Sequence, residues 1–326
     1  MHISRKRSYL LAAAVLAGGM LFSSPAAAQA TRTWVSGVGD DANPCSRTAP
    51  CKTFAGAISK TAAGGEINCL DPGGWGAVTI TKSMTIDCEQ FPGSILNAGV
   101  SGIIINALTT DSVTIRGLTI AGGTGGSAGT NGINILSAGS VLVDNVKIFN
   151  QGQPSPSGFG IRVAPSTGNV QVTVTRSTIS GATSGGISVN PAAAVPASLY
   201  VSDTEFNGNG GAAVALTTAG GGTVLTAVLT NTSITGSRVA NSSGVIAKTT
   251  TGTATIFVQS STIANNAVYG INANGAGATI RVSGTAIVGN ATGVNTANSG
   301  QAISYGNNQL ADNATPGAFT STVPQN

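Results

Sequence analysis

A ten-residue pattern recurs along this chain and limits its fold more than any other feature. Two copies are VTVTRSTISG at residues 172–181 and IRVSGTAIVG at residues 280–289. Positions one, three and eight are almost all aliphatic or aromatic, and position ten is Gly, Asn or Asp. These three residue types tolerate a left-handed backbone, so the pattern predicts a strand that turns a corner at the same place in every copy. The aligned copies begin at Val113, Val141, Val172, Leu199, Ala227, Ile256, Ile280 and Ile303.

A second, shorter phrase follows most copies at a variable distance. It reads Gly-Ile-x-Val or a close variant, at residues 132–135, 160–163, 186–189, 270–273 and 293–296. Fixed strands separated by segments of variable length indicate a regular coil with projecting loops. The copies begin 23 to 31 residues apart, which is the period of a β-solenoid. We predict an all-β fold of about ten parallel coils, stacked at roughly 4.8 Å into a rod of about 45 Å.

The first thirty residues are typical of a signal peptide. Residues 5–7 are basic, residues 10–22 are apolar, and residues 28–30 (AQA) form a small-residue cleavage site. We therefore expect residues 31–326 to be a single secreted domain, located outside the cell, in the periplasm or at the cell surface. No later stretch is apolar enough to cross a bilayer, so we expect no membrane-spanning segment.

The charge of the chain gives no support for a nucleic-acid partner. The sequence has 15 basic and 11 acidic residues, but three of the basic residues lie in the signal peptide. The mature part is therefore nearly neutral, and it also lacks the only histidine, His2. Without an imidazole it has no histidine base and no histidine metal ligand.

The four cysteines, Cys45, Cys51, Cys69 and Cys88, all lie in the mature part. An even number in an oxidising compartment favours two disulfides, and the absence of both CxxC and mature histidine argues against a zinc site. Sequence proximity pairs Cys45 with Cys51. The segments 67–69 and 86–88 share a spacing of 19 residues, so Cys69 and Cys88 are expected to stack on successive coils and to pair.

Residues 31–66 are expected to cap the solenoid. Cys51, Phe54, Ala55 and Ile58 have the spacing of one helix face, in a segment that Pro50 begins and Gly64-Gly65 stops. A solenoid must cover its open strand edge and the end of its core. We expect this short helix to be that lid.

The recurring phrases resemble those of the right-handed parallel β-helix proteins, the pectin-lyase-like fold. They read V-x-I-x-x-S/T-x-I-x-x-N/G and G-I-x-V. The segment 34–58 (WVSGVGDDANPCSRTAPCKTFAGAI) is also similar to the opening of many secreted bacterial β-helix proteins. Some of those are pectate lyases, and many have no known activity. Cys45 departs from the family by standing where Gly is usual, and Cys51 precedes Lys52, which is consistent with a local disulfide. The resemblance covers the mature chain and implies a right-handed parallel β-helix.

The resemblance also limits the chemistry. Enzymes of this fold that hydrolyse polygalacturonate use clustered Asp residues with Gly-His-Gly and Arg-x-Lys, and the mature sequence has none of these combinations. Lyases of this fold need acidic residues that bind calcium and a Lys or Arg that acts as the base. We therefore expect no cofactor, and calcium only if the protein is a lyase.

The repeat region has few charged residues, and stacking the copies brings several of them together on the middle coils. Arg116 and Asp144 share position four of adjacent copies, Arg176 and Asp203 share position five, and Lys147 and Glu205 share position seven two coils apart. Arg162 lies on a Gly-Ile-Arg-Val phrase of the same middle coils. A carboxylate-and-base site would use these residues, but salt bridges that fix the strand register are the favoured interpretation. The candidate catalytic residues are Asp144, Lys147, Arg162, Arg176, Asp203 and Glu205.

Aromatic side chains supply the candidate ligand-binding residues Trp75, Tyr200 and Phe257. Position two points outward, and Leu142, Tyr200, Val228 and Phe257 there would form an apolar strip. Such a strip binds sugars, binds a partner or lies beneath a loop, and the loop is the favoured interpretation. Trp75 would either stack on a sugar ring or fill the first coil beside the lid, which we favour.

Three functions are compatible with these features. The first is a secreted or surface β-helix that binds a polysaccharide, a surface glycan or another partner along its side without catalysis. The second is a pectate-lyase-like polysaccharide lyase acting on an acidic glycan, and the third is a structural or adhesive surface protein. The missing catalytic combinations favour the first. The sequence carries no signal for an oligomeric state.

Overall fold

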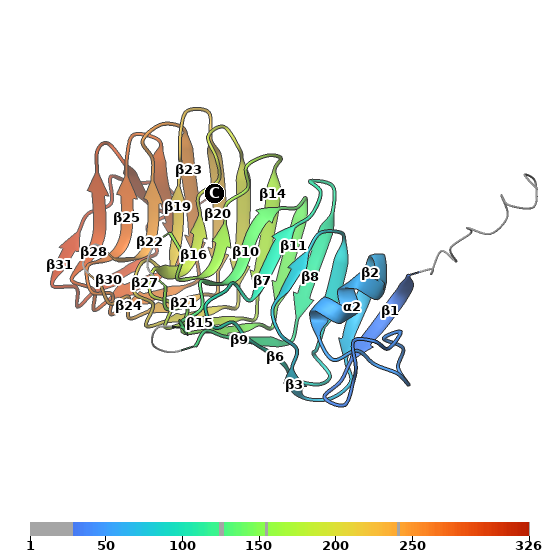
Figure 1. Cartoon of the computed structure of the whole chain (residues 1–326). Helices are drawn as coiled ribbons and strands as arrows, with labels where there is room; N and C mark the ends of the chain where they lie inside the picture. Colours follow the sequence, from blue (N-terminus) through green and yellow to red (C-terminus); the bar gives the residue numbers. More distant parts are fainter. Residues whose placement is uncertain (1–28, 124–126, 154–155, 240–241, 326) are drawn as a thin grey trace, which may run out of the picture.

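The chain forms a parallel β-solenoid of about ten coils in the computed structural model, which describes residues 29–123, 127–153, 156–239 and 242–325. Figure 1 shows the coils stacked in sequence order, from the blue N-terminal end to the red C-terminal end. Each regular coil contributes one strand to each of three parallel sheets, here called A, B and C. The predicted fold class is confirmed. The predicted signal peptide lies almost wholly outside the described residues.

Sheet A has twelve strands, and pattern positions one to four lie on it. In order across the sheet they are β1 (Ala30–Val35), β2 (Thr61–Cys69), β5 (Met84–Asp87), β8 (Ser112–Arg116), β11 (Ser140–Asp144), β14 (Val170–Thr175), β17 (Ala197–Ser202), β20 (Val224–Thr230), β23 (Thr253–Gln259), β26 (Ala278–Ser283), β29 (Gln301–Ser304) and β32 (Ser321–Thr322).

Sheets B and C have ten strands each. Sheet B contains β3 (Gly73–Gly74), β6 (Gly93–Leu96), β9 (Leu118–Ala121), β12 (Lys147–Phe149), β15 (Thr178–Ser180), β18 (Glu205–Asn207), β21 (Ser233–Thr235), β24 (Thr262–Ala264), β27 (Ala286–Val288) and β30 (Gln309–Ala311). Sheet C contains β4 (Val78–Ile80), β7 (Ile103–Asn106), β10 (Asn131–Ser137), β13 (Phe159–Val163), β16 (Gly185–Val189), β19 (Val214–Thr217), β22 (Ser243–Lys248), β25 (Tyr269–Asn274), β28 (Thr292–Ala297) and β31 (Thr315–Gly317).

The core consists of aliphatic side chains that stack in register from coil to coil. On β14, for example, Val170, Val172 and Val174 point inward and are buried, while the residues between them point outward. Val174 continues a column formed by the same pattern position on neighbouring strands, between Val143 and Val201. Because no single coil can bury its own apolar side, stacking removes these side chains from water and stabilises the whole rod.

Two left-handed residues turn the corners of each regular coil. The predicted corner at position ten is confirmed in seven of the eight copies; Gly122 is the exception, because its backbone is not left-handed. A second corner, between sheets A and B, lies at position five and was not predicted. Its residues are Gly117, Asn145, Arg176, Asp203, Asn231, Ser260 and Gly284, all with positive φ.

Polar side chains inside the corners link successive coils. Ser261, for example, accepts a hydrogen bond from the backbone N–H of Thr232 and donates one to the carbonyl of Gln259. At position eleven, the Oδ1 of Asn290 accepts from the backbone N–H of Asn266, and its Nδ2 donates to Oδ1 of Asn313. These ladders satisfy backbone groups that the corners would otherwise bury without partners.

The last aligned copy was placed one residue too late. Ile280 of β26 pairs with Ala302 rather than Ile303, so the copy begins at Ala302. Leu310 nevertheless pairs with Ile287, as predicted. The difference is one extra residue in the corner between these strands.

The N-terminal end is closed by a short helix and by a disulfide-bonded loop. Helix α2 (Phe54–Lys60) begins after Thr53, whose side chain accepts from the Gly56 N–H, and it buries Phe54 and Ala57 against the end of the core. The prediction that this helix covers the end of the core is therefore confirmed. The open edge of β1 is covered instead by the loop, because the carbonyl of Cys45 accepts from the Trp34 N–H.

Both predicted disulfides are present. Cys45 and Cys51 lie at the two ends of the loop that covers β1, with their Cα atoms 4.6 Å apart. Cys69 and Cys88 lie on successive coils, with their Cα atoms 4.9 Å apart. Within the described residues, no helix is long and apolar enough to cross a membrane.

Candidate functional site

Charged residues gather on the outward face of sheet A at its N-terminal end. Asp144 is the most buried of them, and its carboxylate accepts hydrogen bonds from Thr175 Oγ1 at 2.7 Å and from Arg176 Nη2 at 2.6 Å. Arg116 lies beside Asp144 in register, with 3.8 Å between Nε and Oδ2. Arg176 also reaches Glu89 at 3.1 Å. We call Glu89, Arg116, Asp144 and Arg176 the ion-pair row.

The ion-pair row shifts the pKa values of Asp144 and Arg176. The hydrogen bond from Arg176 holds the pKa of Asp144 below its ordinary value, and the bond from Thr175 and the charges of both arginines act in the same direction against partial burial. The same hydrogen bond raises the pKa of Arg176. Asp144 is therefore a weak proton donor and Arg176 a weak proton acceptor.

A second ion pair lies on the first two strands of the same face. Arg32 Nη2 contacts Glu66 Oε1 at 2.7 Å, and Asn68 donates to the same carboxylate oxygen. Partial burial raises the pKa of Glu66. The hydrogen bonds from Arg32 and Asn68 and the charge of Arg32 lower it by more, so the pKa lies below its ordinary value. Glu66 is thus held as a carboxylate.

The other candidate catalytic residues do not join the ion-pair row. Asp203 forms no ion pair with Arg176 among the described residues; it accepts from Asn231 Nδ2 at 2.5 Å. Lys147 and Glu205 lie in register on sheet B with Thr178 between them, as predicted, and form no ion pair within the described chain. A shallow depression of about 470 Å³ contains Arg176, Asp203 and Glu205.

Arg162 lies on a different side of the solenoid. It points outward from β13 of sheet C, where its Nη1 donates to Asn134 Oδ1 at 3.3 Å. The sequence placed Arg162 on the same coils as Asp144 and Arg176, which is correct. A coil has three faces, however, so residues of one coil need not meet.

The apolar strip predicted from position two is present on sheet A. Tyr200, Val228 and Phe257 are adjacent in register, while Thr173 separates Leu142 from them. Tyr200 is 42% exposed and Val228 37% exposed, so no loop of the described residues covers them, contrary to the favoured interpretation. Phe257 packs edge-on against the ring of Tyr305, with 5.8 Å between ring centroids.

Trp75 is not a surface residue. Only 1% of it is exposed, and its ring lies so close to Gly73 that a Cβ there would be 2.5 Å from it. Its carbonyl accepts a hydrogen bond from the Phe54 N–H at the start of the lid helix. Trp75 therefore fills the first coil beneath the cap, as favoured from the sequence, and its ring cannot stack on a sugar at the surface.

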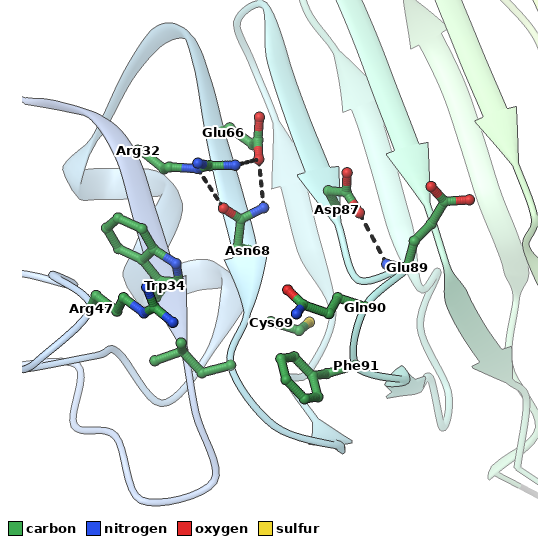
Figure 2. Close-up of a pocket in the computed structure, with 11 residues that line it drawn as sticks. Arg32, Trp34, Arg47, Glu66, Asn68, Cys69, Asp87, Glu89, Gln90 and Phe91 are labelled. Atoms are coloured by element: carbon green, nitrogen blue, oxygen red, sulfur yellow. Dashed lines mark hydrogen bonds and ion pairs between the residues drawn. The ribbon is translucent and has the colours of Figure 1, made fainter.

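A groove of about 330 Å³ opens on sheet A beside β1, and we call it the N-terminal groove. Figure 2 shows Trp34 and Arg47 on one side of it and Gln90 and Phe91 on the other. Asn68 lies between the two sides. The repeat pattern did not reveal this groove, because the aligned copies begin only at Val113. One signal was available: β5 pairs with β8, so extending the alignment to Met84 would have placed Asp87 at position four beside Arg116.

The described residues do not fit a calcium site. They contain no group of three or more Asp, Glu, Cys or His side chains placed to hold one metal ion. Calcium takes six to eight oxygen ligands, usually several carboxylates. Glu66 and the carboxylates of the ion-pair row are already bonded to arginines.

Comparisons with known proteins define the fold. The protein-family model described as "right handed beta helix region" matches residues 76–227 of this chain. The structure resembles the pectate lyase Pel9A, with a TM-score of 0.63 and 13% identity over 92% of this chain and 80% of that one. It resembles a rhamnogalacturonan lyase with a TM-score of 0.58 and 11% identity, over 83% of this chain and 75% of that one.

A third solved structure has a similar fold. The GH136 lacto-N-biosidase from Eubacterium ramulus matches with a TM-score of 0.52 and 11% identity, over 90% of this chain and 67% of that one. A comparison with curated protein sequences finds no match. The chain therefore has the right-handed parallel β-helix of the pectin-lyase-like fold, and at these identities the likeness shows the fold alone.

Proposed function

We propose that this protein binds a polysaccharide along the outward face of sheet A and does not cleave it. The exposed part of the apolar strip carries this proposal. Tyr200 and Val228 are exposed neighbours in register on successive coils, and the half-buried Phe257 continues the row on the next coil. Aromatic and aliphatic side chains pack against the C–H faces of sugar rings, so a row of them suits a linear chain of rings.

The state of the charged groups supports binding without cleavage. A lyase needs a base near the proton that is removed and a group that neutralises the substrate carboxylate. Arg176 holds its proton more tightly than a free arginine because of Asp144, and Asp144 is itself occupied by arginine and threonine donors. Neither group is poised to move a proton.

The comparisons and the disulfides support a secreted glycan-binding role. Three of the proteins with similar folds are named as a pectate lyase, a rhamnogalacturonan lyase and a lacto-N-biosidase. Glycans are therefore substrates of other chains built on this scaffold, although their chemistry does not transfer with the fold. Two disulfides are typical of proteins exported to an oxidising compartment, which agrees with the predicted signal peptide.

Affinity electrophoresis in gels that contain neutral or acidic polysaccharides would test this proposal. We expect at least one polysaccharide to retard the wild type, and Tyr200→Ala to weaken that binding about tenfold, because the exposed ring is lost. Tyr269→Ala is the matched control, since Tyr269 lies on β25 of sheet C. If no polysaccharide in the panel slowed the protein in the gel, the result would contradict the proposal and favour a structural or adhesive role.

The same panel separates binding from cleavage. We expect no unsaturated products from any polysaccharide, with or without added calcium. Unsaturated products from the wild type would overturn the non-catalytic proposal and make the protein a polysaccharide lyase.

A further inference from the structure

We propose that the N-terminal groove is a subsite for one uncharged pyranose ring of a glycan. This inference rests on the proposed glycan-binding function, but it concerns a separate place on sheet A. The groove lies over β1 and β2, whereas the exposed part of the apolar strip lies over β17 and β20. Its volume of about 330 Å³ is at the lower end of the range for small-molecule sites.

Two half-buried aromatic rings form opposite sides of the groove. Trp34 points outward from β1, and Phe91 lies in the segment that follows Cys88 (Figure 2). Aromatic rings are the side chains that pack against the C–H groups of a sugar, and the guanidinium of Arg32 lies over the Trp34 ring, 6.0 Å from its centroid. A pyranose between them would contact apolar surface on both sides.

The polar groups of the groove are arranged to hydrogen-bond hydroxyls. Arg47 and Gln90 have no hydrogen-bond or ion-pair partner among the described residues, and they lie on opposite sides of the groove. Asp87 accepts one hydrogen bond, from the Glu89 N–H at 3.0 Å, and has acceptor capacity left. A planar guanidinium, an amide and a carboxylate together provide donors and acceptors for neighbouring hydroxyl groups.

The charge balance of the groove favours an uncharged ring. The groove and the adjoining ion-pair row together hold four arginines and four carboxylates, so their charges cancel. Within the groove, the guanidinium of Arg47 and the carboxylate of Asp87 form no ion pair with another described residue. A uronate would place its carboxylate near Asp87 as well as Arg47 and would gain little, whereas a neutral ring uses both groups.

The two disulfides hold the sides of the groove in place. Arg47 lies within the loop closed by Cys45 and Cys51, and Cys88 joins the segment of Gln90 and Phe91 to β2. A site whose walls are held covalently loses little conformational entropy when a ligand binds. Both covalent links of the described chain thus lie at the groove.

Tryptophan fluorescence would report on this groove directly. The chain has two tryptophans, and Trp75 is 1% exposed, so any ligand-induced change would come from Trp34. We would titrate the full protein with neutral gluco-, manno- and galacto-oligosaccharides and with oligogalacturonate. At least one neutral oligosaccharide should change the emission, and Trp34→Phe should abolish that change.

Variants of the polar groups complete the test. Arg47→Ala and Gln90→Ala should each weaken the binding of the neutral oligosaccharide at least fivefold without lowering the melting temperature, while Arg238→Ala, a matched arginine outside the groove, should not weaken it. Tighter binding of oligogalacturonate than of every neutral oligosaccharide would overturn the proposed ligand class. Retardation in the gel assay with no change in Trp34 emission would overturn the groove and leave the proposed function standing.

Discussion

The two ends of sheet A are stabilised in different ways. At position four the early strands carry Asp87, Arg116 and Asp144, whereas the later strands carry Ser202, Thr230, Gln259 and Ser283. Both disulfides lie in the first coils. The later coils, within the described residues, have no ion pair or disulfide and rely on stacked aliphatic columns and on ladders such as Asn266–Asn290–Asn313.

The difference follows from the position of each coil in the stack. A middle coil has a neighbour on both sides, which supplies its hydrogen bonds and covers its core. The first coil has only one, so its edge and its core must be closed by other segments, which are the Cys45–Cys51 loop and helix α2. The Cys45–Cys51 loop also supplies Arg47 to one side of the N-terminal groove. The regular coils therefore present the apolar strip and a shallow depression, whereas the groove with aromatic sides lies at the irregular end.

Removal of the disulfide between Cys69 and Cys88 should destabilise the N-terminal coils more than any other change proposed here. Closing a loop of this length stabilises a fold by about 3 kcal/mol, so the double change to Ala should lower the free energy of unfolding by about that amount. Hydrogen exchange would locate the loss, which we expect in residues 61–88 and not in residues 254–290. Equal loss of protection at both ends would show that the first coils are not a separately stabilised unit.

A change at a corner tests the regular coils. Gly236 has φ of +70°, and a Cβ there would have its nearest neighbour 3.6 Å away, so the site has space but a strained backbone for other residues. Gly236→Val should therefore cost about 1–2 kcal/mol, because only the backbone conformation is penalised. Thr235→Val is the control and should be mild. Similar losses for both variants in urea unfolding would contradict the assignment of the corner to position ten.

The ion-pair row should make the charged end sensitive to acid. The pKa of Asp144 is lower in the folded protein than in an unfolded chain, so its contribution is complete above about pH 4 and is lost as the pH falls through the folded value. Asp144→Asn should cost about 1 kcal/mol at pH 7 and much less at pH 2.5. Urea unfolding of the wild type and the variant at both pH values would measure this difference. A penalty that does not change with pH would mean that the carboxylate charge contributes nothing.

The smallest effects are expected from the charged residues outside the row. Lys147 and Asp203 are exposed, and neither forms an ion pair within the described chain. Lys147→Ala should cost about 0–1 kcal/mol, and Asp203→Ala somewhat more, because Asp203 has a positive φ that Ala tolerates less well. Melting would be measured together with cleavage of acidic glycans, and we expect none from the wild type. Calcium-dependent cleavage that either change abolished, with folding intact, would identify these residues as part of an enzyme.

The repeat could be predicted from the sequence because each strand keeps its aliphatic spacing. The corner at position ten was visible because nearly all its residues are Gly or Asn. The corner at position five was missed because Arg176 and Ser260 interrupt its Gly, Asn and Asp residues, and the structure imposes the left-handed backbone on these two. The extra residue before Leu310 was hidden for a similar reason, since corner length leaves no mark on strand spacing.

The candidate site was predictable only where it follows the repeat. Tyr200, Val228 and Phe257 are adjacent in register as predicted, because position two points outward on every coil. The partners of Arg176 were not predictable, because its side chain reaches back to Asp144 and Glu89 rather than to its own position on the next coil. The N-terminal groove is formed by segments outside the pattern, so no periodicity could reveal it.

Hydroxyl-radical footprinting with and without a bound polysaccharide would test the central claim, that sheet A is the glycan-binding face. The method reports the solvent exposure of individual aromatic side chains. We expect lower oxidation of Tyr200 on the apolar strip and of Trp34 and Phe91 in the N-terminal groove, with no change at Tyr269 on sheet C. Protection of Tyr269 while Tyr200 and Trp34 stay unchanged would place the glycan on another face and contradict the account.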